Sequence, residues 1–459
     1  MLMASWRREL RDLSLLAAPL VLAQLAQNGM SVVDTLMVGR LGPHALAGIA
    51  LGGTLFTLML ILCMGVLFAV GPMVSHAYGG QRPEEAARAA RQGLWLALAL
   101  SVPGVLVFVF ARPLLLLTGQ EPGVAAASGG YLRAMAWGFP FALVLTSLRG
   151  FLEGHGDTRP ILVVAALGVG LNVLANDVLM YGRFGFPRLG LVGTGYATAV
   201  VYATMALLVA VYLRWRYRRY RVFAGLRRPD PAMLAELFRV GWPISLTLGF
   251  EVGLFSLTAL LMGRFGDAAL AGHQIALQSA STTFMVPLGV SIAAGVRVGQ
   301  AAGRGDAAGV TRAGFTGVAL SALFMAFAGT LFRFAPDAVI GLYLRVGDPA
   351  NGAVVTFARR FLAIAAIFQI FDGTQVTASG ALRGLKDTRV PMLLTLVAYW
   401  LVAVPVGVAL AFPGGAGPSG LWFGLVVGLG TAAVLLVGRL ALQVRWRRRA
   451  GRRPAAELR

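Results

Sequence analysis

The chain has 459 residues, of which 58% are hydrophobic and only 13% are charged, and its formal net charge is +21. A soluble globular domain carries about 25% charged residues, so the composition excludes an ordinary soluble protein. The single cysteine, Cys63, excludes an intramolecular disulfide.

Apolar segments that are long enough to cross a bilayer recur along the whole chain. A membrane-spanning helix needs about 20 apolar residues. The first segment has no clear small-residue cleavage site, so we expect it to remain as a span rather than to be removed as a signal peptide. The segments predict an all-α polytopic membrane protein with twelve transmembrane helices rather than a barrel of alternating strands. They lie at about 13–38, 48–75, 93–112, 128–150, 160–181, 191–213, 240–262, 271–296, 313–333, 357–380, 390–411 and 420–442.

The first segment contains an acid, Asp34, fifteen residues after Pro19. A carboxylate is costly in hydrocarbon and is usually functional there. A proline inside a helix removes a backbone hydrogen bond and permits a kink, so a kinked helix with a protonatable acid can be a moving part. The competing interpretation is an aspartate that is hydrogen-bonded into a static polar cluster.

The fifth and sixth segments contain polar residues that can join Asp34. Asn172 and Asn176 are four residues apart and therefore share one helix face. With Asp34, and with Thr198 on the next segment, they can supply oxygen ligands to a hard cation such as Na⁺. Asn and Thr also form ordinary interhelical hydrogen bonds in membranes, which is the alternative. Asp177 faces another side near a helix end, and we expect it to be structural.

Clusters of arginine follow the sixth and the twelfth segments. With the N-terminus in the cytoplasm, most Lys and Arg residues fall in cytoplasmic segments, as the positive-inside rule requires. We therefore expect a bacterial inner membrane protein with both termini in the cytoplasm. We interpret the basic tail as a lipid-headgroup anchor, and we expect no nucleic-acid partner. The clusters are Arg214, Arg216, Arg218, Arg219 and Arg221, and Arg445, Arg447, Arg448 and Arg449.

The second half of the chain repeats the first. The segment 39–48 returns as 263–272, and Pro19 returns as Pro243. Each half contains six segments, so both halves enter the membrane in the same orientation with a substrate path between them. We predict an N-terminal lobe at 1–221 and a C-terminal lobe, with the basic tail, at 222–459. Leu-Arg-Gly at 148–150 and Asp-Thr-Arg at 157–159 also return, at 382–384 and 387–389, and both Asp-Thr pairs can cap the helices that follow.

Two acids lie inside segments of the second half, Glu251 in the seventh and Asp372 in the tenth. A buried carboxyl group with a second carboxyl beside it can hold a proton near neutral pH and release it when water enters. When ionised, it attracts an organic cation. The competing interpretation is a structural ion pair, with Arg359 or Arg360 as the partner. His273, near the start of the eighth segment, is typical of an interfacial residue.

The intramembrane acids do not follow the repeat. Asp34 corresponds to Thr258, Glu251 to Gln27 and Asp372 to Gly138. If these acids served only the common scaffold, we would expect them in both halves. Their asymmetry therefore favours a functional role.

These motifs together resemble the multidrug and toxic compound extrusion (MATE) family and, within it, the NorM branch. The resemblance covers nearly the whole chain from Pro19. It rests on Val33-Asp34-Thr35, Asn172 and Asn176, Phe250-Glu251, Ala271-Gly272-His273-Gln274, Asp372, and Leu382-Arg383-Gly384 followed by Lys386-Asp387.

The resemblance implies twelve helices in two six-helix lobes, and export of cationic amphipathic compounds in exchange for Na⁺ or H⁺. Carried over by position, Asp34, Asn172, Asn176 and Thr198 form a cation site in the N-terminal lobe, and Glu251 and Asp372 form one in the C-terminal lobe. Phe368 stands where several relatives have a tyrosine, so the site loses a hydroxyl oxygen that Na⁺ would use.

We therefore predict a secondary-active multidrug antiporter that works as a monomer, with a possible Na⁺ ligand set at Asp34, Asn172 and Asn176 and no cofactor beyond the coupling ion. A flippase for lipid-linked oligosaccharides of the same broad fold is the alternative, but it should line its cavity with Arg or Lys. A membrane enzyme such as a prenyl transferase would need clustered aspartates for Mg²⁺, whereas these acids lie singly on different segments. We therefore do not expect an enzyme.

Overall fold

A computed structural model describes residues 2–224, 226 and 228–450, so residues 451–459 of the predicted basic tail lie outside the described residues. Within the described residues, twelve helices are long and apolar enough to cross a membrane, which confirms the predicted all-α polytopic fold. These spans are Ser5–Gly39, Ala45–Gly79, Pro83–Val109, Pro122–His155, Arg159–Tyr181, Leu191–Arg216, Pro231–Phe265, Asp267–Gly303, Ala307–Phe334, Pro349–Gly384, Arg389–Ala411 and Pro418–Arg449.

Most of these spans extend beyond the apolar segments that predicted them. Hydropathy marks only the part of a helix that suits hydrocarbon, whereas the backbone ladder continues into polar residues at the membrane surface. The third predicted segment differs, because its helix ends at Val109 and a short helix, α5 (Ala111–Leu117), follows.

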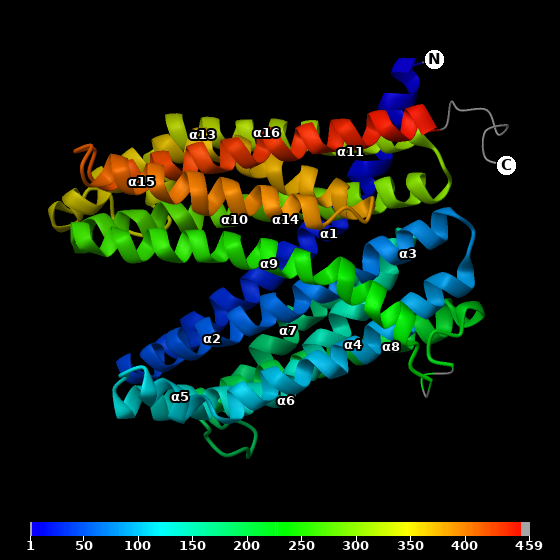
Figure 1. Cartoon of the computed structure of the whole chain (residues 1–459). Helices are drawn as coiled ribbons and strands as arrows, with labels where there is room; N and C mark the ends of the chain where they lie inside the picture. Colours follow the sequence, from blue (N-terminus) through cyan, green and yellow to red (C-terminus); the bar gives the residue numbers. More distant parts are fainter. Residues whose placement is uncertain (1, 225, 227, 451–459) are drawn as a thin grey trace, which may run out of the picture. The chain divides into compact units, whose positions relative to one another are not determined.

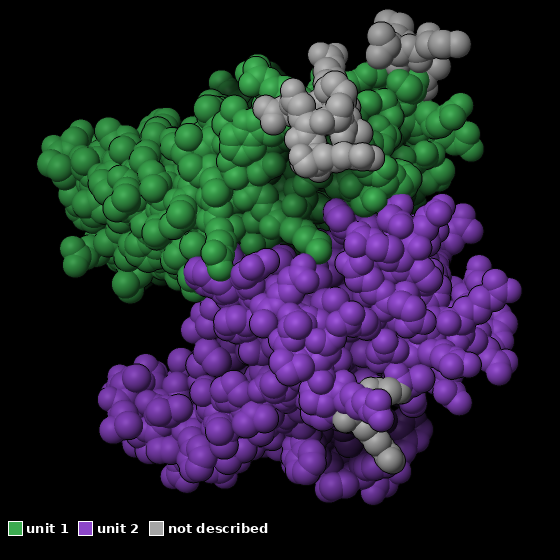
Figure 2. All heavy atoms as spheres, turned by 45° about the vertical axis from the view of Figure 1, so that its right-hand side comes forward, with its two compact units in different colours: residues 1–21, 246–459 green, residues 22–245 purple. Residues whose placement is uncertain are grey.

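Contacts divide the chain into two compact units, which Figure 2 shows in different colours. Unit 1 comprises Met1–Val21 and Leu246–Arg459, and unit 2 comprises Leu22–Ser245. The predicted lobes, 1–221 and 222–459, follow the sequence repeat. The compact units instead begin and end inside two long helices, α1 (Leu2–Gly39) and α9 (Pro231–Met262).

Packing explains why the units divide inside these helices. The first part of α1 belongs to unit 1, where Val21 lies against Gly289. The first part of α9 belongs to unit 2, where the Ser245 hydroxyl donates to the Leu62 carbonyl at 2.6 Å. The sequence repeat cannot reveal this exchange, because it records similarity rather than contact.

In unit 2, α6 is the helix with the most packed neighbours, which are α2, α3, α4, α5 and α8, and Figure 1 labels all of them. Small residues bring these helices close, and Gly150 of α6 approaches Gly71 of α3, so that an added Cβ would lie 3.1 Å from the Gly71 nitrogen. The helices of this unit are α2 (Pro43–Leu67), α3 (Val70–Gly79), α4 (Pro83–Val109), α5, α6 (Pro122–His155), α7 (Arg159–Tyr181) and α8 (Leu191–Arg216), followed by the 3₁₀ turn Arg218–Tyr220.

In unit 1, α13 is the corresponding helix and packs against α10, α11 and α16, which Figure 1 labels. Gly384 of α13 approaches Gly295 of α10, at the repeat positions of Gly150 and Gly71. The two halves therefore fold alike. The elements of this unit are α10 (Asp267–Gly303), α11 (Ala307–Phe334), α12 (Pro336–Ile340), α13 (Gly352–Gly384), α14 (Arg389–Leu396), the π-helix η4 (Val397–Ala403), α15 (Val404–Ala411) and α16 (Pro418–Ala450), with 3₁₀ turns at Gly263–Phe265 and Pro349–Asn351.

Prolines explain two irregular spans. The second span breaks between α2 and α3, where Pro72 cannot donate to the carbonyl of Phe68. In the eleventh span, Pro405 removes the N–H that would bond to Leu401, and the preceding turns form the π-helix η4. Single π-helical turns inside α-helices occur frequently at functional sites.

Candidate functional site

The first candidate site lies in unit 2 and is centred on Asp34 of α1. Two amide groups of α7 bind its carboxylate: Asn172 Nδ2 donates to Asp34 Oδ1 at 3.0 Å, and Asn176 Nδ2 donates to the same oxygen at 2.6 Å. Both asparagines are fully buried. Their spacing of four residues puts the two amides on one face of α7, as the sequence predicts.

This arrangement leaves the amide oxygens of both asparagines buried and without a hydrogen-bond partner among the described residues. A buried carbonyl oxygen without a partner is uncommon and requires an explanation. Next to a carboxylate, two such oxygens are suitable ligands for a small hard cation. The Thr198 hydroxyl donates to the Thr194 carbonyl in its own helix at 3.0 Å, and this bond leaves the lone pairs of the hydroxyl oxygen available as a further ligand.

Two tyrosines near Asp34 have no counterpart in the sequence prediction. Tyr131 of α6 and Tyr202 of α8 both lie within electrostatic range of the Asp34 carboxylate. Tyr202 is four residues after Thr198, so the face of α8 that the prediction had already selected contains it. This spacing is the signal that could have identified it.

Asp177 lies away from this group. Its carboxylate forms an ion pair with Arg183 at 3.1 Å, at the end of α7. The contact agrees with the structural role that we expected for Asp177.

The second candidate site lies in unit 1, where Glu251 of α9 and Asp372 of α13 interact electrostatically with each other. Asp372 is 4% exposed, and Gln375 Nε2 donates to its Oδ1 at 3.3 Å. Arg383, one of the repeated arginines, acts on Glu251 electrostatically, and its Nη2 also donates to Ser291 Oγ at 3.2 Å. Two acids from separate helices are therefore close neighbours in this unit.

Arg359 does not neutralise this pair. Its guanidinium binds the Asp337 carboxylate through two hydrogen bonds, of 2.6 and 2.8 Å. These bonds hold the pKa of Asp337, which lies between two spans, below its usual range. The structure therefore gives this arginine a partner other than Glu251 or Asp372.

Aromatic rings pack beside the second site. Phe368, one turn before Asp372 on α13, is fully buried and packs edge-on against Trp422 and Phe255, with ring centroids 5.9 and 6.0 Å away. Because residue 368 is a phenylalanine, α13 offers no tyrosine hydroxyl one turn before Asp372. Two turns of α13 further from Asp372, the Phe361 ring stacks on the same Trp422.

His273 differs from the interfacial residue that we expected. Its ring is fully buried, packs edge-on against Trp422 at 5.6 Å, and has no hydrogen-bond partner at either nitrogen among the described residues. The prediction was wrong because nearness to a helix end in the sequence does not show which face of α10 is covered by α16.

Several polar atoms of unit 1 were not found by sequence reasoning. The Tyr399 hydroxyl is fully buried and lies within electrostatic range of both Glu251 and Asp372. Gln369 accepts a hydrogen bond from the Thr283 hydroxyl. Glutamine and threonine also form ordinary interhelical hydrogen bonds in membranes, so residue identity alone gives no signal, and the contacts of all three residues depend on helix packing.

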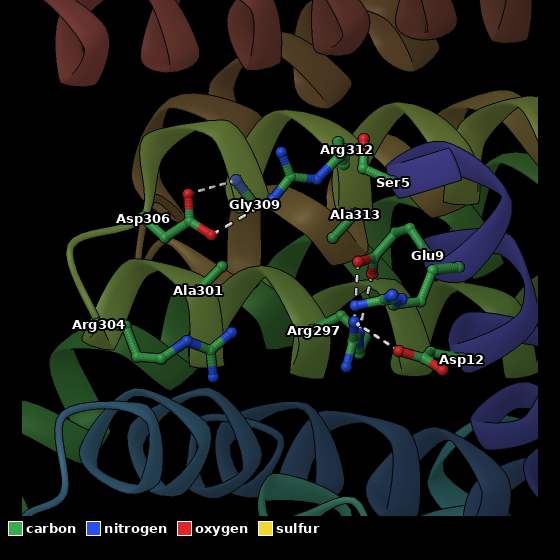
Figure 3. Close-up of a pocket in the computed structure, with 11 residues that line it drawn as sticks. Ser5, Glu9, Asp12, Arg297, Ala301, Arg304, Asp306, Gly309, Arg312 and Ala313 are labelled. Carbon is green, nitrogen blue, oxygen red and sulfur yellow. Dashed lines mark hydrogen bonds and ion pairs between the residues drawn. The ribbon is translucent and has the colours of Figure 1, made fainter. Parts of the chain in front are cut away.

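A separate charged cavity of about 410 Å³ lies in unit 1 where α1, α10 and α11 meet (Figure 3). Arg297 of α10 donates to both carboxylate oxygens of Glu9 at 2.8 Å and to Asp12 at 3.3 Å. The contacts of Arg297 hold the start of α1 to α10. Asp306 caps α11 by accepting from the Gly309 nitrogen at 2.7 Å.

We had expected the repeated Asp-Thr pairs to cap the helices that follow them. In the structure, neither α7 nor α14 has a side-chain cap hydrogen bond, so this prediction was wrong. Asp157 instead accepts from the hydroxyls of Tyr212 and Tyr217 at 2.8 and 3.0 Å. Asp387 accepts from Arg439 and Gln443, both at 2.7 Å. Each aspartate thus binds residues in or directly after the last helix of its own repeat. Burial and the nearby Asp157 carboxylate raise the pKa of Tyr217.

A family model described as MatE matches residues 19–178 and 243–409 of the chain. The two matched blocks begin at the repeated prolines, Pro19 and Pro243. Among curated proteins, the chain is 44% identical to a protein of Pseudomonas putida called "Probable multidrug resistance protein NorM", over 93% of each chain. It is 42% identical to the "Multidrug resistance protein NorM" of Burkholderia vietnamiensis, over 96% of this chain and 95% of that one.

Solved structures with the same fold include two transporters. The eukaryotic MATE transporter AtDTX14 aligns with a TM-score of 0.84 at 21% identity, covering 97% of this chain and 99% of that chain. A multidrug resistance MATE family transporter of the MOP superfamily, solved in an outward-facing conformation, aligns with a TM-score of 0.87 at 20% identity, covering 96% of each chain. At these identities the likeness concerns the fold.

Proposed function

Because the chain belongs to the MatE family of membrane transporters, we propose that it is a secondary-active multidrug antiporter. It exports amphipathic organic cations in exchange for H⁺ or Na⁺ by alternating access. It does so in the bacterial inner membrane, with both termini in the cytoplasm. Its relatives are named for multidrug resistance, which supports drugs as the substrates.

The observation that carries this proposal is the Glu251–Asp372 pair within membrane spans. Two neighbouring carboxyl groups, one of them nearly fully buried, are costly in a membrane and are retained where they serve function. When ionised they attract an organic cation, and the aromatic rings beside them offer cation–π and apolar contact. When a proton binds, that attraction is lost.

Coupling follows from this competition. An ion and a substrate that bind the same carboxylates, with different affinities in the two membrane-facing states, are linked in free energy. Inward movement of the coupling ion can therefore drive outward movement of the drug. Neither ligand has to touch the other.

The Asp34 site supports a second place for the coupling ion. The buried oxygens of Asn172 and Asn176 lie on the two side chains that bind Asp34. Oxygen ligands suit Na⁺, and an ionised Asp34 supplies the countercharge. The second site has Phe368 where a hydroxyl would assist Na⁺, so we assign H⁺ to the Glu251–Asp372 pair.

The flippase alternative has less support from these residues. A carrier of pyrophosphate-linked lipids needs cationic groups where the phosphates pass. The spans instead have acids at their two candidate sites. If the alternative were true, Asp372→Asn would leave transport of lipid-linked oligosaccharide intact.

Transport by the Asp372→Asn variant tests the proposal. The asparagine keeps the size of the side chain but cannot ionise, so it can neither exchange a proton nor attract a cation. We expect gradient-driven efflux of a fluorescent organic cation to be lost, while membrane insertion, read by expression and monodispersity, stays at the wild-type level. Normal efflux by this variant would overturn the assignment.

A further inference from the structure

Tyr399 is the fully buried aromatic residue of the π-helix η4 in the eleventh span. Its hydroxyl has no hydrogen-bond partner among the described residues. The great majority of buried side-chain polar atoms are hydrogen-bonded, because an unpaired hydroxyl loses its water without compensation. A phenylalanine would fill the same space without this cost, so the hydroxyl requires an explanation.

The surroundings of η4 bring Tyr399 into the neighbourhood of the acids of unit 1. Trp400, the next residue, packs so closely on Gly253 of α9 that a Cβ there would lie 2.9 Å from its ring. Gly253 follows Glu251 by two residues, so η4 and α9 touch at the level of that acid. The Tyr399 hydroxyl lies within electrostatic range of the carboxyl groups of both Glu251 and Asp372.

Among the described residues, charged and titratable groups near the pair come from α9, α13 and α10. Glu251 projects from α9, and Asp372 and Arg383 project from α13, with Arg383 acting on Glu251. His273 projects from α10 and packs its ring on Trp422. Gln375 is the hydrogen-bond donor to Asp372 among the described residues, and it occupies one of that group's two oxygens. The carboxylate pair therefore has room for a further donor.

A donor from another helix matters more at this site because the Phe368 ring of α13 has no hydroxyl. This ring is fully buried one turn before Asp372 and contributes no hydroxyl. The ring packs against Trp422 and Phe255 in the core cluster that also contains Tyr399. Within this cluster, Tyr399 has the hydroxyl that Phe368 lacks, on a different helix.

We propose that the Tyr399 hydroxyl is a working member of the Glu251–Asp372 site and donates a hydrogen bond to whichever carboxyl group is ionised. Tyr399 thereby sets the pH at which the site gives up its proton. It is a positioning residue for proton exchange rather than a core-filling aromatic. Its role in coupling depends on the antiport proposed above, but its effect on proton binding does not.

The test is a Tyr399→Phe variant of the full chain, reconstituted in lipid nanodiscs. The infrared band of protonated carboxyl groups is recorded as a function of pH, and the part that Asp372→Asn or Glu251→Gln removes is assigned to the pair. The Tyr343→Phe variant is the matched control, because that hydroxyl bonds to Ser279 at 3.2 Å and lies on a half-exposed residue between spans.

We expect the assigned band in Tyr399→Phe to titrate about one pH unit higher than in the wild type, because one donor to a charged acceptor is lost. Tyr343→Phe should titrate like the wild type. Thermal stability, measured alongside at a pH where both carboxyl groups are protonated, should match the wild type in Tyr399→Phe, because the proposed hydrogen bond forms only with an ionised carboxyl group. This separates the expected shift from unfolding.

An unchanged titration in Tyr399→Phe would overturn the inference and leave Tyr399 as a core residue. The same result together with gradient-driven flux in the wild type would leave the proposed antiport standing. A shifted titration without flux in the wild type would support the inference and contradict the antiport. The two proposals therefore fail separately.

Discussion

Asp34 shows what an acid inside a membrane span requires of its neighbours. A lone carboxylate in hydrocarbon is costly, and here two amide N–H groups of α7 offset that cost. The oxygens of the same two amides remain buried, without a hydrogen-bond partner in the part of the chain that the structure describes. Such an arrangement is more costly than a fully satisfied polar cluster, and a cation that used those oxygens would complete it.

Asn176→Ala tests whether the amides support transport. It removes the shorter of the two hydrogen bonds to Asp34 and one of the two free amide oxygens. A hydrogen bond to a charged group contributes about 1.5–3 kcal/mol, so we expect gradient-driven drug flux to fall by roughly 10-fold or more. Flux in proteoliposomes measures this.

Asn351→Ala is the matched control for this variant. It makes the same change at a partly exposed residue of the 3₁₀ turn Pro349–Asn351, whose amide donates to the Arg345 carbonyl, and its flux should equal that of the wild type. Equal flux in Asn176→Ala and Asn351→Ala would show that the α7 amides have no part in coupling.

The residues of the two sites differ in how far the sequence could predict them. Asn172 and Asn176 were accessible because both lie on one helix, where a spacing of four residues fixes a shared face. Tyr399, Gln369 and His273 were not, because their roles depend on which helices touch. That information arises from packing and is absent from the local sequence.

Among the secondary-structure elements, α6 and α13 show how the repeat becomes a fold. Each is the central helix of its unit, and each approaches a neighbour through a glycine of the repeated Leu-Arg-Gly motif. Without a hydrophobic driving force between helices in lipid, close backbone contact is a main source of packing energy. Gly150 and Gly384 are therefore scaffold residues.

Gly384→Ala should destabilise unit 1. The added Cβ would collide with the backbone carbonyl of Gly295, which cannot move without shifting α10. Overpacking of this kind costs about 1–3 kcal/mol, so the midpoint of thermal unfolding in detergent should fall. Gly438→Ala on α16 is the control, because nothing lies within 4 Å of its added Cβ and alanine favours a helix. A Gly384→Ala protein as stable as this control would contradict the packing argument.

The charged cavity of Figure 3 is a second element-level feature, and it holds the start of α1 in unit 1. Arg297 binds two acids of α1, which lie 285 and 288 residues away in the sequence. Neither the apolar segments nor the repeat predicts this pairing. The pairing depends on the start of α1 packing in unit 1, which also contains Arg297.

Arg297→Met should loosen this attachment. The methionine keeps much of the side-chain bulk but leaves Glu9, which is 7% exposed, without its guanidinium partner. Removing one partner of a buried pair costs about 3–5 kcal/mol, and we expect about 1–3 kcal/mol here because Arg297 is partly exposed.

Faster hydrogen exchange in residues 5–15 would show the loss directly. The control is Arg304→Met, on the same cavity wall, whose arginine is exposed and has no ion pair among the described residues. If both variants exchange at the wild-type rate, the ion pairs do not hold α1.

For the whole molecule, hydropathy and the internal repeat predicted the class of fold, the order of the twelve spans and their similar halves. They could not predict the limits of the compact units. Those limits depend on packing: Val21 of α1 lies against Gly289 in unit 1, and Ser245 of α9 bonds to Leu62 in unit 2. They also could not predict the π-helix, since Pro405 breaks the ladder but packing decides how the chain adapts. Local signals thus defined the elements, and long-range packing defined the sites.

The central claim is that an ion gradient drives drug export through the acids of the two sites. Its most direct test is uptake of a fluorescent organic cation into proteoliposomes under an imposed pH gradient and, separately, an imposed Na⁺ gradient. The account predicts uptake under at least one gradient and none without a gradient, with the pH gradient acting through Glu251 and Asp372. Absence of uptake under both gradients would contradict it.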